Sequence, residues 1–351
     1  MAITLHEKYA KQIGKVFAEK SLISGRLSNK YDFTGVKTVR VMTPITVPTV
    51  AYNRTAGSNR YGTPTEMGDI VQELTLTQDR SFSLTVDKGN FKDQSHLKTA
   101  AVVLRLQTEE RFVPEMDKYV FEQLGIKAGT SVSSTAPTVS TIVGLVATGT
   151  QALDDAEVPQ NGRTLFVDAA HYKLIKGSTE FLGIDDLGVD AVKNGVVGTL
   201  DGMPVVKVPA TRWPTGLCFL IVQKDCATAP VKLDETKLHV DPPGISGNLL
   251  EGRQYYDCFV FGHRCNGVYA YYNTSTITKT TTPTIAASGG AFSGVTGGTY
   301  HFTTDGSDPR YSMTAKTGAG SDVTAAGTVV KCYATKTGQI PSAVATQTLT
   351  A

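Results

Sequence analysis

Apolar side chains recur every three or four positions across residues 91–124, which is the period of one face of an α-helix. The pattern predicts a long helix around which the rest of the chain is organised. Asp93 or Ser95 is placed to cap its first turn, because a short side-chain oxygen can bond the unpaired N–H groups there. Pro114 interrupts the pattern, since it lacks an N–H and its ring collides with the preceding turn. We therefore expect a kink near Arg111 or two helices in series, and Pro114 is a hinge candidate.

Two elements before this helix are predicted to need a partner surface. Residues 3–20 place their apolar side chains on one side of a short helix, which is marginally stable alone. A β-branched run over residues 36–50 and an alternating run over residues 74–86 predict the two strands of a long hairpin. The intervening residues 52–69 are rich in turn formers. Because a two-stranded ribbon is unstable by itself, we expect the hairpin to lie on a neighbouring subunit.

Three arginines on or near this hairpin are candidates for contacts between subunits: Arg54, Arg60 and Arg80. The planar guanidinium group of arginine suits the carboxylates of a partner chain. A solvated loop explains the same residues equally well, because exposed ion pairs contribute little to stability.

The chain after the long helix predicts a mixed α/β domain. Short apolar runs at residues 163–168 and 217–223 are typical of buried strands, and residues 169–177 continue the first of them as a helix. Residues 195–208 predict a hairpin whose turn is Asp201-Gly202, a dipeptide that tolerates positive φ.

A strand pair and a small separate domain are predicted at the end of the chain. The strands of the pair cover residues 253–261 and 268–272. Residues 273–283 are rich in threonine, as expected of a linker. Residues 284–351 are rich in Ala, Gly and Thr and contain short alternating strands, which favours a small all-β sandwich.

Composition narrows the function classes. A net charge of +2 over 351 residues gives no bulk reason for tight wrapping by nucleic acid. The five cysteines have no paired spacing, which indicates a reducing compartment and no disulfide framework. No stretch approaches the roughly 20 apolar residues of a membrane span, and the first residues lack the apolar core of a signal peptide.

A search for catalytic or ligand-binding patterns favours no enzyme. Ser246 lies in a Gly-Ile-Ser-Gly run that is one residue short of a nucleophile motif. Cys258, His263 and Cys265 come nearest to a metal cluster, but the segment lacks a CxxC pair and a fourth ligand. We interpret them as buried cysteines and a surface histidine. No catalytic, metal-binding or cofactor-binding residue is therefore predicted, and no cofactor.

The order of these parts resembles the major capsid protein of tailed bacteriophages, the Hong Kong 97-type fold. The motifs that carry the resemblance are Met116-Asp-Lys-Tyr119 with Leu124-Gly125, Arg163-Thr-Leu-Phe-Val167, and Asn194-Gly195 followed by Leu200-Asp-Gly202 and Val205-Val206. The implied fold class is α+β. The resemblance divides the chain into an N-terminal arm (1–35), a projecting β-hairpin or E-loop with its base (36–90), a peripheral domain with a spine helix (91–140 and 246–275), an axial α/β domain (141–245), a linker (276–283) and a C-terminal domain (284–351).

The resemblance implies a shell subunit that forms hexamers and pentamers of itself and closes an icosahedral head around double-stranded DNA. It implies a virion protein assembled in the cytoplasm of a host bacterium, with a portal, decoration proteins and non-specific DNA contacts as partners, and no membrane. Because the arm begins almost at Met1, we expect a separate scaffolding protein or none. The lysine crosslink of the namesake is not expected, since no lysine lies between Met42 and Asp87.

The final segment looks like the immunoglobulin-like C-terminal domain of chitobiases and similar bacterial surface modules. The residues that carry this resemblance are Tyr300-His-Phe-Thr-Thr-Asp-Gly-Ser-Asp-Pro309, with Val330-Lys-Cys-Tyr-Ala334 and Ser342-Ala-Val344. Tyr300 and Tyr311 are its candidates for glycan contact. A bacterial glycan-binding or adhesion protein is therefore the alternative function, with an unrecognised hydrolase as a further rival.

Overall fold

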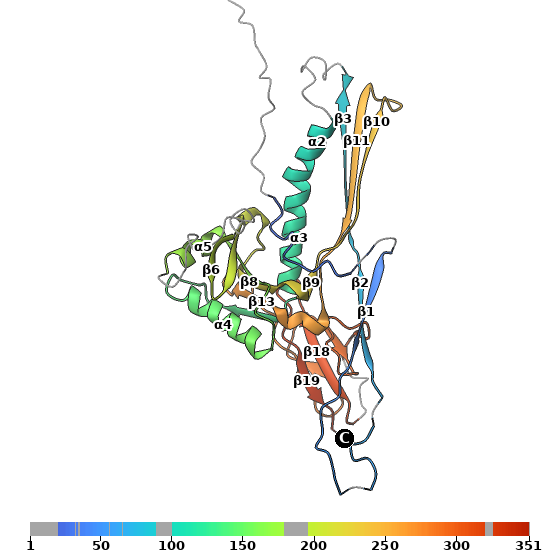
Figure 1. Cartoon of the computed structure of the whole chain (residues 1–351), viewed down its shortest axis with the longest axis vertical. Helices are drawn as coiled ribbons and strands as arrows, with labels where there is room; N and C mark the ends of the chain where they lie inside the picture. Colours follow the sequence, from blue (N-terminus) through green and yellow to red (C-terminus); the bar gives the residue numbers. More distant parts are fainter. Residues whose placement is uncertain are drawn as a thin grey trace, which may run out of the picture.

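A long helix and a three-stranded sheet run beside each other along the longest axis of the molecule (Figure 1). In this computed structural model the described residues are 20–31, 33, 36–55, 57–64, 66–88, 100–178, 196–319 and 326–350. Residues 3–19 of the predicted helix over residues 3–20, and residues 91–99 with their expected cap, lie outside them.

The spine helix is continuous through Pro114. It consists of α2 (Ala100–Gln107), a π-helical turn η1 (Thr108–Phe112) and α3 (Val113–Ile126). The Val113 N–H donates a hydrogen bond to the carbonyl of Thr108, five residues earlier. This wider π turn accommodates Pro114 without ending the helix. The interruption expected near Arg111 is therefore a π turn within one helix.

The sheet beside this helix has the order β10 (Val231–Val240), β11 (Gly247–Tyr256) and β3 (Gln78–Asp87), all antiparallel. The rings of Phe82 on β3 and Phe112 on the helix lie 5.4 Å apart and join the two layers. The strand β10 was not predicted. It pairs with β11, although residues 141–245 were expected to belong together in the axial domain.

The second large sheet of the molecule has six strands, some parallel and some antiparallel. Its order is β4 (Thr130–Ser134), β13 (Val268–Asn273), β8 (Leu217–Gln223), β5 (Arg163–Asp168), β7 (Met203–Val208) and β6 (Val196–Leu200). Leu165 and Val167 share one apolar cluster with α4 (Ile142–Asp155) and α5 (Ala169–Lys176). Phe166 belongs to the cluster on the opposite face of the sheet, where its ring centroid lies 5.2 Å from that of Phe121 of α3. Alternate residues of one strand thus join two cores.

The predicted projecting hairpin is present but shorter than expected. β1 (Thr38–Pro44) pairs with β2 (Asp69–Thr75) along its whole length, and the described residues between them, 45–55, 57–64 and 66–68, contain no strand. The return strand does not continue to residue 86 in this hairpin, because the chain changes partner after Leu76 and enters the three-stranded sheet. Alternation predicts a strand but does not specify its neighbour, so the single long ribbon was wrong.

The predicted strand pair near residue 260 is also wrong in its pairing. β11 and the short β12 (Phe259–Val260) precede β13, but β12 pairs with β9 (Ala227–Thr228) and β13 joins the six-stranded sheet. A 3₁₀ turn, η5 (Gly262–Gly267), lies between β12 and β13.

The C-terminal residues form two antiparallel sheets around a small core (Figure 1). One sheet contains β14 (Thr284–Ile285) and β15 (Phe292–Ser293), and the other has the order β17 (Lys316–Thr317), β16 (Thr299–Thr303), β18 (Val329–Thr335) and β19 (Ala345–Thr348). The buried members of the core are Ile285, Phe302, Val330, Cys332 and Leu349. The β content agrees with the sequence, and the immunoglobulin-like assignment stays a prediction.

Candidate assembly surfaces

The loop of the projecting hairpin exposes an unusual number of large apolar side chains. Tyr61 is 85% exposed, and the same loop and its flanks expose Met42, Ile45, Val47, Val50, Tyr52 and Met67. The loop is nevertheless ordered internally, because the Asn53 N–H bonds the Arg60 carbonyl at 3.0 Å and the rings of Tyr52 and Tyr61 meet at 4.9 Å. Large exposed apolar side chains that gather on one segment are typical of an interaction surface.

The structure separates the three candidate arginines. Arg54 and Arg60 are exposed on the projecting loop. Arg80 lies on β3 instead, where its Nε is 3.1 Å from Oε1 of Glu115 on the spine helix. Arg80 thus fastens the sheet to the helix within one subunit, and its role as a contact between subunits stays a prediction.

A buried carboxylate anchors the base of the hairpin. Asp257 is almost fully buried and accepts hydrogen bonds from the amide and hydroxyl of Thr77 (2.8 Å each), the Tyr119 hydroxyl (2.8 Å) and the Cys258 amide (2.7 Å). Burial raises the pKa of the Tyr119 hydroxyl, and the carboxylate of Asp257 adds to that rise. Tyr119 therefore remains a donor, and the junction of β2 and β3 is tied to the spine helix.

A second buried carboxylate holds the start of the described chain. Asp117 of α3 accepts from the Ser21 hydroxyl (2.8 Å), the Leu22 amide (3.2 Å) and Arg212 (2.8 Å). Arg212 also donates to the Lys20 carbonyl at 3.1 Å. Burial raises the pKa of Asp117 and outweighs the hydrogen bonds and the arginine charge, which lower it. This cluster joins the arm, the spine helix and the six-stranded sheet domain.

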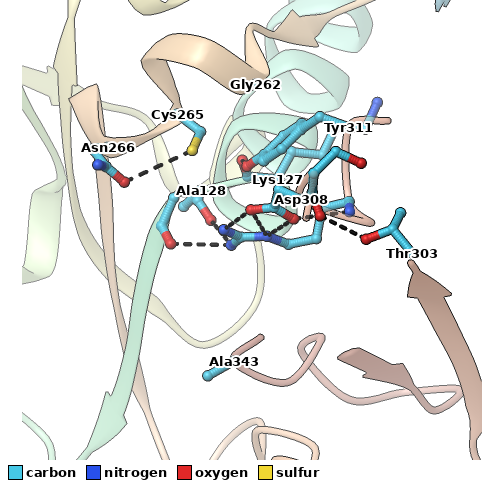
Figure 2. Close-up of polar contacts among 12 residues, drawn as sticks. Lys127, Ala128, Gly262, Cys265, Asn266, Thr303, Asp308, Tyr311 and Ala343 are labelled. Atoms are coloured by element: carbon cyan, nitrogen blue, oxygen red, sulfur yellow. Dashed lines mark hydrogen bonds and ion pairs between the residues drawn. The ribbon is translucent and has the colours of Figure 1, made fainter. Parts of the chain in front are cut away.

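The C-terminal domain is docked on the end of the spine helix (Figure 2). Arg310 donates to the carbonyls of Ala128 (3.1 Å) and Gly129 (3.0 Å), and the Tyr311 hydroxyl donates to the carbonyl of Lys127 (2.6 Å). Asp308 holds the same guanidinium group through both of its oxygens, at 2.7–3.2 Å. The domain is therefore packed against the rest of the chain.

The predicted linker also makes fixed contacts. The amide of Thr280 bonds the Ile340 carbonyl (2.9 Å), and the amide of Ile340 bonds the Thr278 carbonyl (3.0 Å). The Lys279 ammonium group reaches the Ser131 carbonyl at 2.5 Å. Residues 278–280 of the predicted linker thus contact both the six-stranded sheet and the C-terminal domain.

The two tyrosines predicted to contact glycans are occupied by internal contacts. Tyr311 is 8% exposed, since its ring lies in the docking interface. The Tyr300 hydroxyl bonds both the amide (3.1 Å) and the carbonyl (3.2 Å) of Val295, and its ring packs on Phe292. Tyr311 is thus buried against the rest of the chain in the single subunit, whereas Tyr300 is partly exposed and its glycan contact stays a prediction.

The cysteines are all buried and unpaired. Burial raises the pKa of the thiols of Cys218, Cys226, Cys258 and Cys332 to about 12. In the described part of the chain, no three His, Cys, Asp or Glu side chains gather closely enough to hold a metal ion. None of the helices described is both long and apolar enough to cross a membrane.

No protein-family model and no curated protein matches the sequence. Solved structures do match. A structure from Mycobacterium phage Che8 has a TM-score of 0.59 at 18% identity and covers 76% of this chain and 96% of its own. The capsid structure of cyanophage P-SCSP1u has a TM-score of 0.60 at 10% identity, covering 76% and 92%.

The mature capsid of bacteriophage PhiM1 gives the same result, with a TM-score of 0.59 at 13% identity over 77% of this chain and 92% of its own. This chain has a phage capsid fold. The capsid fold predicted from the order of elements is thereby confirmed. Nearly all of each matched chain is accounted for, whereas about a quarter of this chain lies outside each match. This chain therefore carries an addition to the capsid fold of those structures.

Proposed function

We propose that this chain is the major capsid protein of a tailed double-stranded DNA bacteriophage. The observation that carries the proposal is the structural match to capsids, which is nearly complete over the length of each matched chain. It is supported by a projecting hairpin whose apolar side chains have no cover in the single subunit. In this structural role the chain acts by self-assembly.

In the proposed mechanism the hairpin loop buries its apolar side chains on a neighbouring subunit. Arg54 and Arg60 lie on the same loop and pair with carboxylates of that neighbour. Permanent interfaces of this kind bury roughly 2,000 Å² or more, which requires several interlocked contacts. Hexamers and pentamers then close an icosahedral shell, held together without a lysine crosslink from the hairpin.

The proposed partners and location follow from this role. The subunit assembles in the cytoplasm of a host bacterium with a separate scaffolding protein and a portal, and it resides in the virion. Its contact with packaged DNA is independent of sequence and weak, because the net charge is only +2. The C-terminal domain faces outward, where it stabilises the shell or adheres weakly to surfaces or glycans.

Pro114 is the proposed hinge of the spine helix during shell expansion. It follows a π turn, where the backbone already departs from regular α-helical bonding, so bending there disrupts fewer hydrogen bonds than elsewhere. Glu115, which pairs with Arg80 of β3, is the next residue after Pro114, so a bend at Pro114 would move this ion pair.

Assembly is tested by mass photometry and negative-stain microscopy of the purified, recombinantly expressed chain, with and without a crowding agent and a co-expressed scaffold. We expect rings of five and six subunits or closed shells. A paired variant, Tyr52→Ser with Tyr61→Ser, removes exposed rings from the loop and is expected to give folded single subunits. A wild-type chain that stays monomeric under all of these conditions would refute the proposal.

A further inference from the structure

The C-terminal domain contacts two elements of the capsid fold at once. One is the end of the spine helix, through Arg310 and Tyr311. The other is the base of the projecting hairpin, because the Met313 amide bonds the Val71 carbonyl of β2 at 3.2 Å. Figure 1 shows the domain beside the hairpin, at the end of the molecule opposite to α2. The four residues from Arg310 to Met313 therefore span the junction between helix and hairpin.

The helix end offers a natural site for a cation. The dipole of an α-helix places partial negative charge at its C-terminal end, and here that end is Ile126 with its cap residue Lys127. Arg310 bonds two carbonyls directly after the helix, and Asp308 fixes the orientation of its guanidinium group. Charge-assisted bonds with this geometry are about twice as strong as neutral ones.

The hairpin base is held from both sides. Gln72 of β2 donates to the Val260 carbonyl (2.9 Å) and accepts from the Gly262 amide (2.8 Å). Tyr311 packs directly on Gly262, where an added Cβ would lie 2.7 Å from the Cβ of Tyr311. A glycine at this position thus allows the domain to approach. The Met313 amide covers part of the open edge of β2, which a two-stranded ribbon leaves unpaired.

We propose that the C-terminal domain is an intramolecular brace, which uses Arg310 and Tyr311 as a latch to fix the direction of the projecting hairpin relative to the spine helix. An isolated two-stranded ribbon is not stable in one orientation, so its direction depends on what its base is attached to. The brace adds to the attachment that Asp257 and Gln72 give the hairpin base in the single subunit, before any neighbour is present. The inference therefore holds or fails independently of the assembly role.

Hydrogen exchange of the full-length chain, measured as single subunits, tests the brace. Arg310→Ala removes the bonds to the helix end, and Gly262→Leu drives a side chain into the site of Tyr311. Lys336→Ala is the matched control, because it removes a cation from an exposed turn of the same domain. Exchange in residues 69–75 and at the Met313 amide reports the junction, and exchange in residues 329–335 reports whether the domain itself stays folded.

We expect both junction variants to exchange about tenfold faster than wild type in residues 69–75 and at Met313, with the domain core unchanged. The control should match wild type throughout. Wild-type exchange in residues 69–75 in both variants would overturn the proposal, because the hairpin would then be held without the latch.

Discussion

Removing Asp117 is expected to destabilise the chain more than any exposed substitution. Its side chain is 0% exposed and that of its partner Arg212 is 4% exposed, so solvent screens neither charge. The substitution Asp117→Leu leaves Arg212 buried without its carboxylate. Breaking one side of a buried pair costs about 3–5 kcal/mol, whereas removing both charges avoids the uncompensated one. The double variant Asp117→Leu with Arg212→Met should therefore regain about 2 kcal/mol of the loss.

Urea unfolding followed by tryptophan fluorescence measures these effects at the site. Trp213 is the single tryptophan of the chain, follows Arg212 directly and packs its ring against Phe121. Ser21→Ala is the control, since it removes one hydrogen bond to the same carboxylate and should cost about 1 kcal/mol. A loss below about 1 kcal/mol for Asp117→Leu, or a double variant no more stable than the single one, would refute the reasoning.

Four further predictions concern individual sites. Because burial raises the pKa of four thiols to about 12 and all five cysteines are buried, native protein should resist maleimide at pH 8 until urea exposes the cysteines. The unfolded chain loses these protons near pH 8.5, so stability should fall as pH rises from there toward 12, as measured by urea midpoints. Gly129→Val should cost about 1–3 kcal/mol in the same assay, because its Cβ would lie 2.3 Å from the backbone oxygen of Cys265; an unchanged midpoint contradicts the packing. Pro114→Ala should slow shell expansion, as measured by light scattering. Expansion at the wild-type rate would refute the hinge proposal.

The sequence predicted the elements whose pattern is local. The strands 163–168 and 217–223 and the helix after Asp168 agree with the structure, as does the Asp201-Gly202 turn, where both residues have positive φ. Apolar runs and turn dipeptides specify such elements within a few residues of themselves. The order of these elements was enough to predict the capsid fold.

Long-range pairing and the helix α4 could not be read from the sequence. The helix contains Gly144, Gly149 and Thr150, which are poor helix formers, and tertiary packing overrides this preference. At Gly149 a Cβ would lie 2.9 Å from Ile221, so the glycine permits close packing on the sheet. Likewise, the alternation of residues 74–86 does not indicate that β3 pairs with β11 and not with a strand of the hairpin.

Among the candidate contact residues, those on local turns were placed correctly, whereas one buried by a distant segment was not. Arg54 and Arg60 lie on the projecting loop, where turn-forming residues placed them. Tyr311 was expected at an open surface, but its burial depends on a helix end some 180 residues earlier, as the separation of 184 positions from Lys127 shows. The signal that could have found the latch is the Asp308-Pro-Arg310-Tyr311 run, an acidic, cationic and aromatic set on one turn.

Electron cryomicroscopy of particles purified from cells that express this chain tests the central claim most directly. The account predicts closed shells with rings of five and six subunits, in which residues 45–68 of each subunit lie buried against a neighbour. In the same map, the C-terminal domain should remain docked at Arg310 on its own subunit. Discrete single subunits, or shells in which residues 45–68 stay exposed to solvent, would contradict the account.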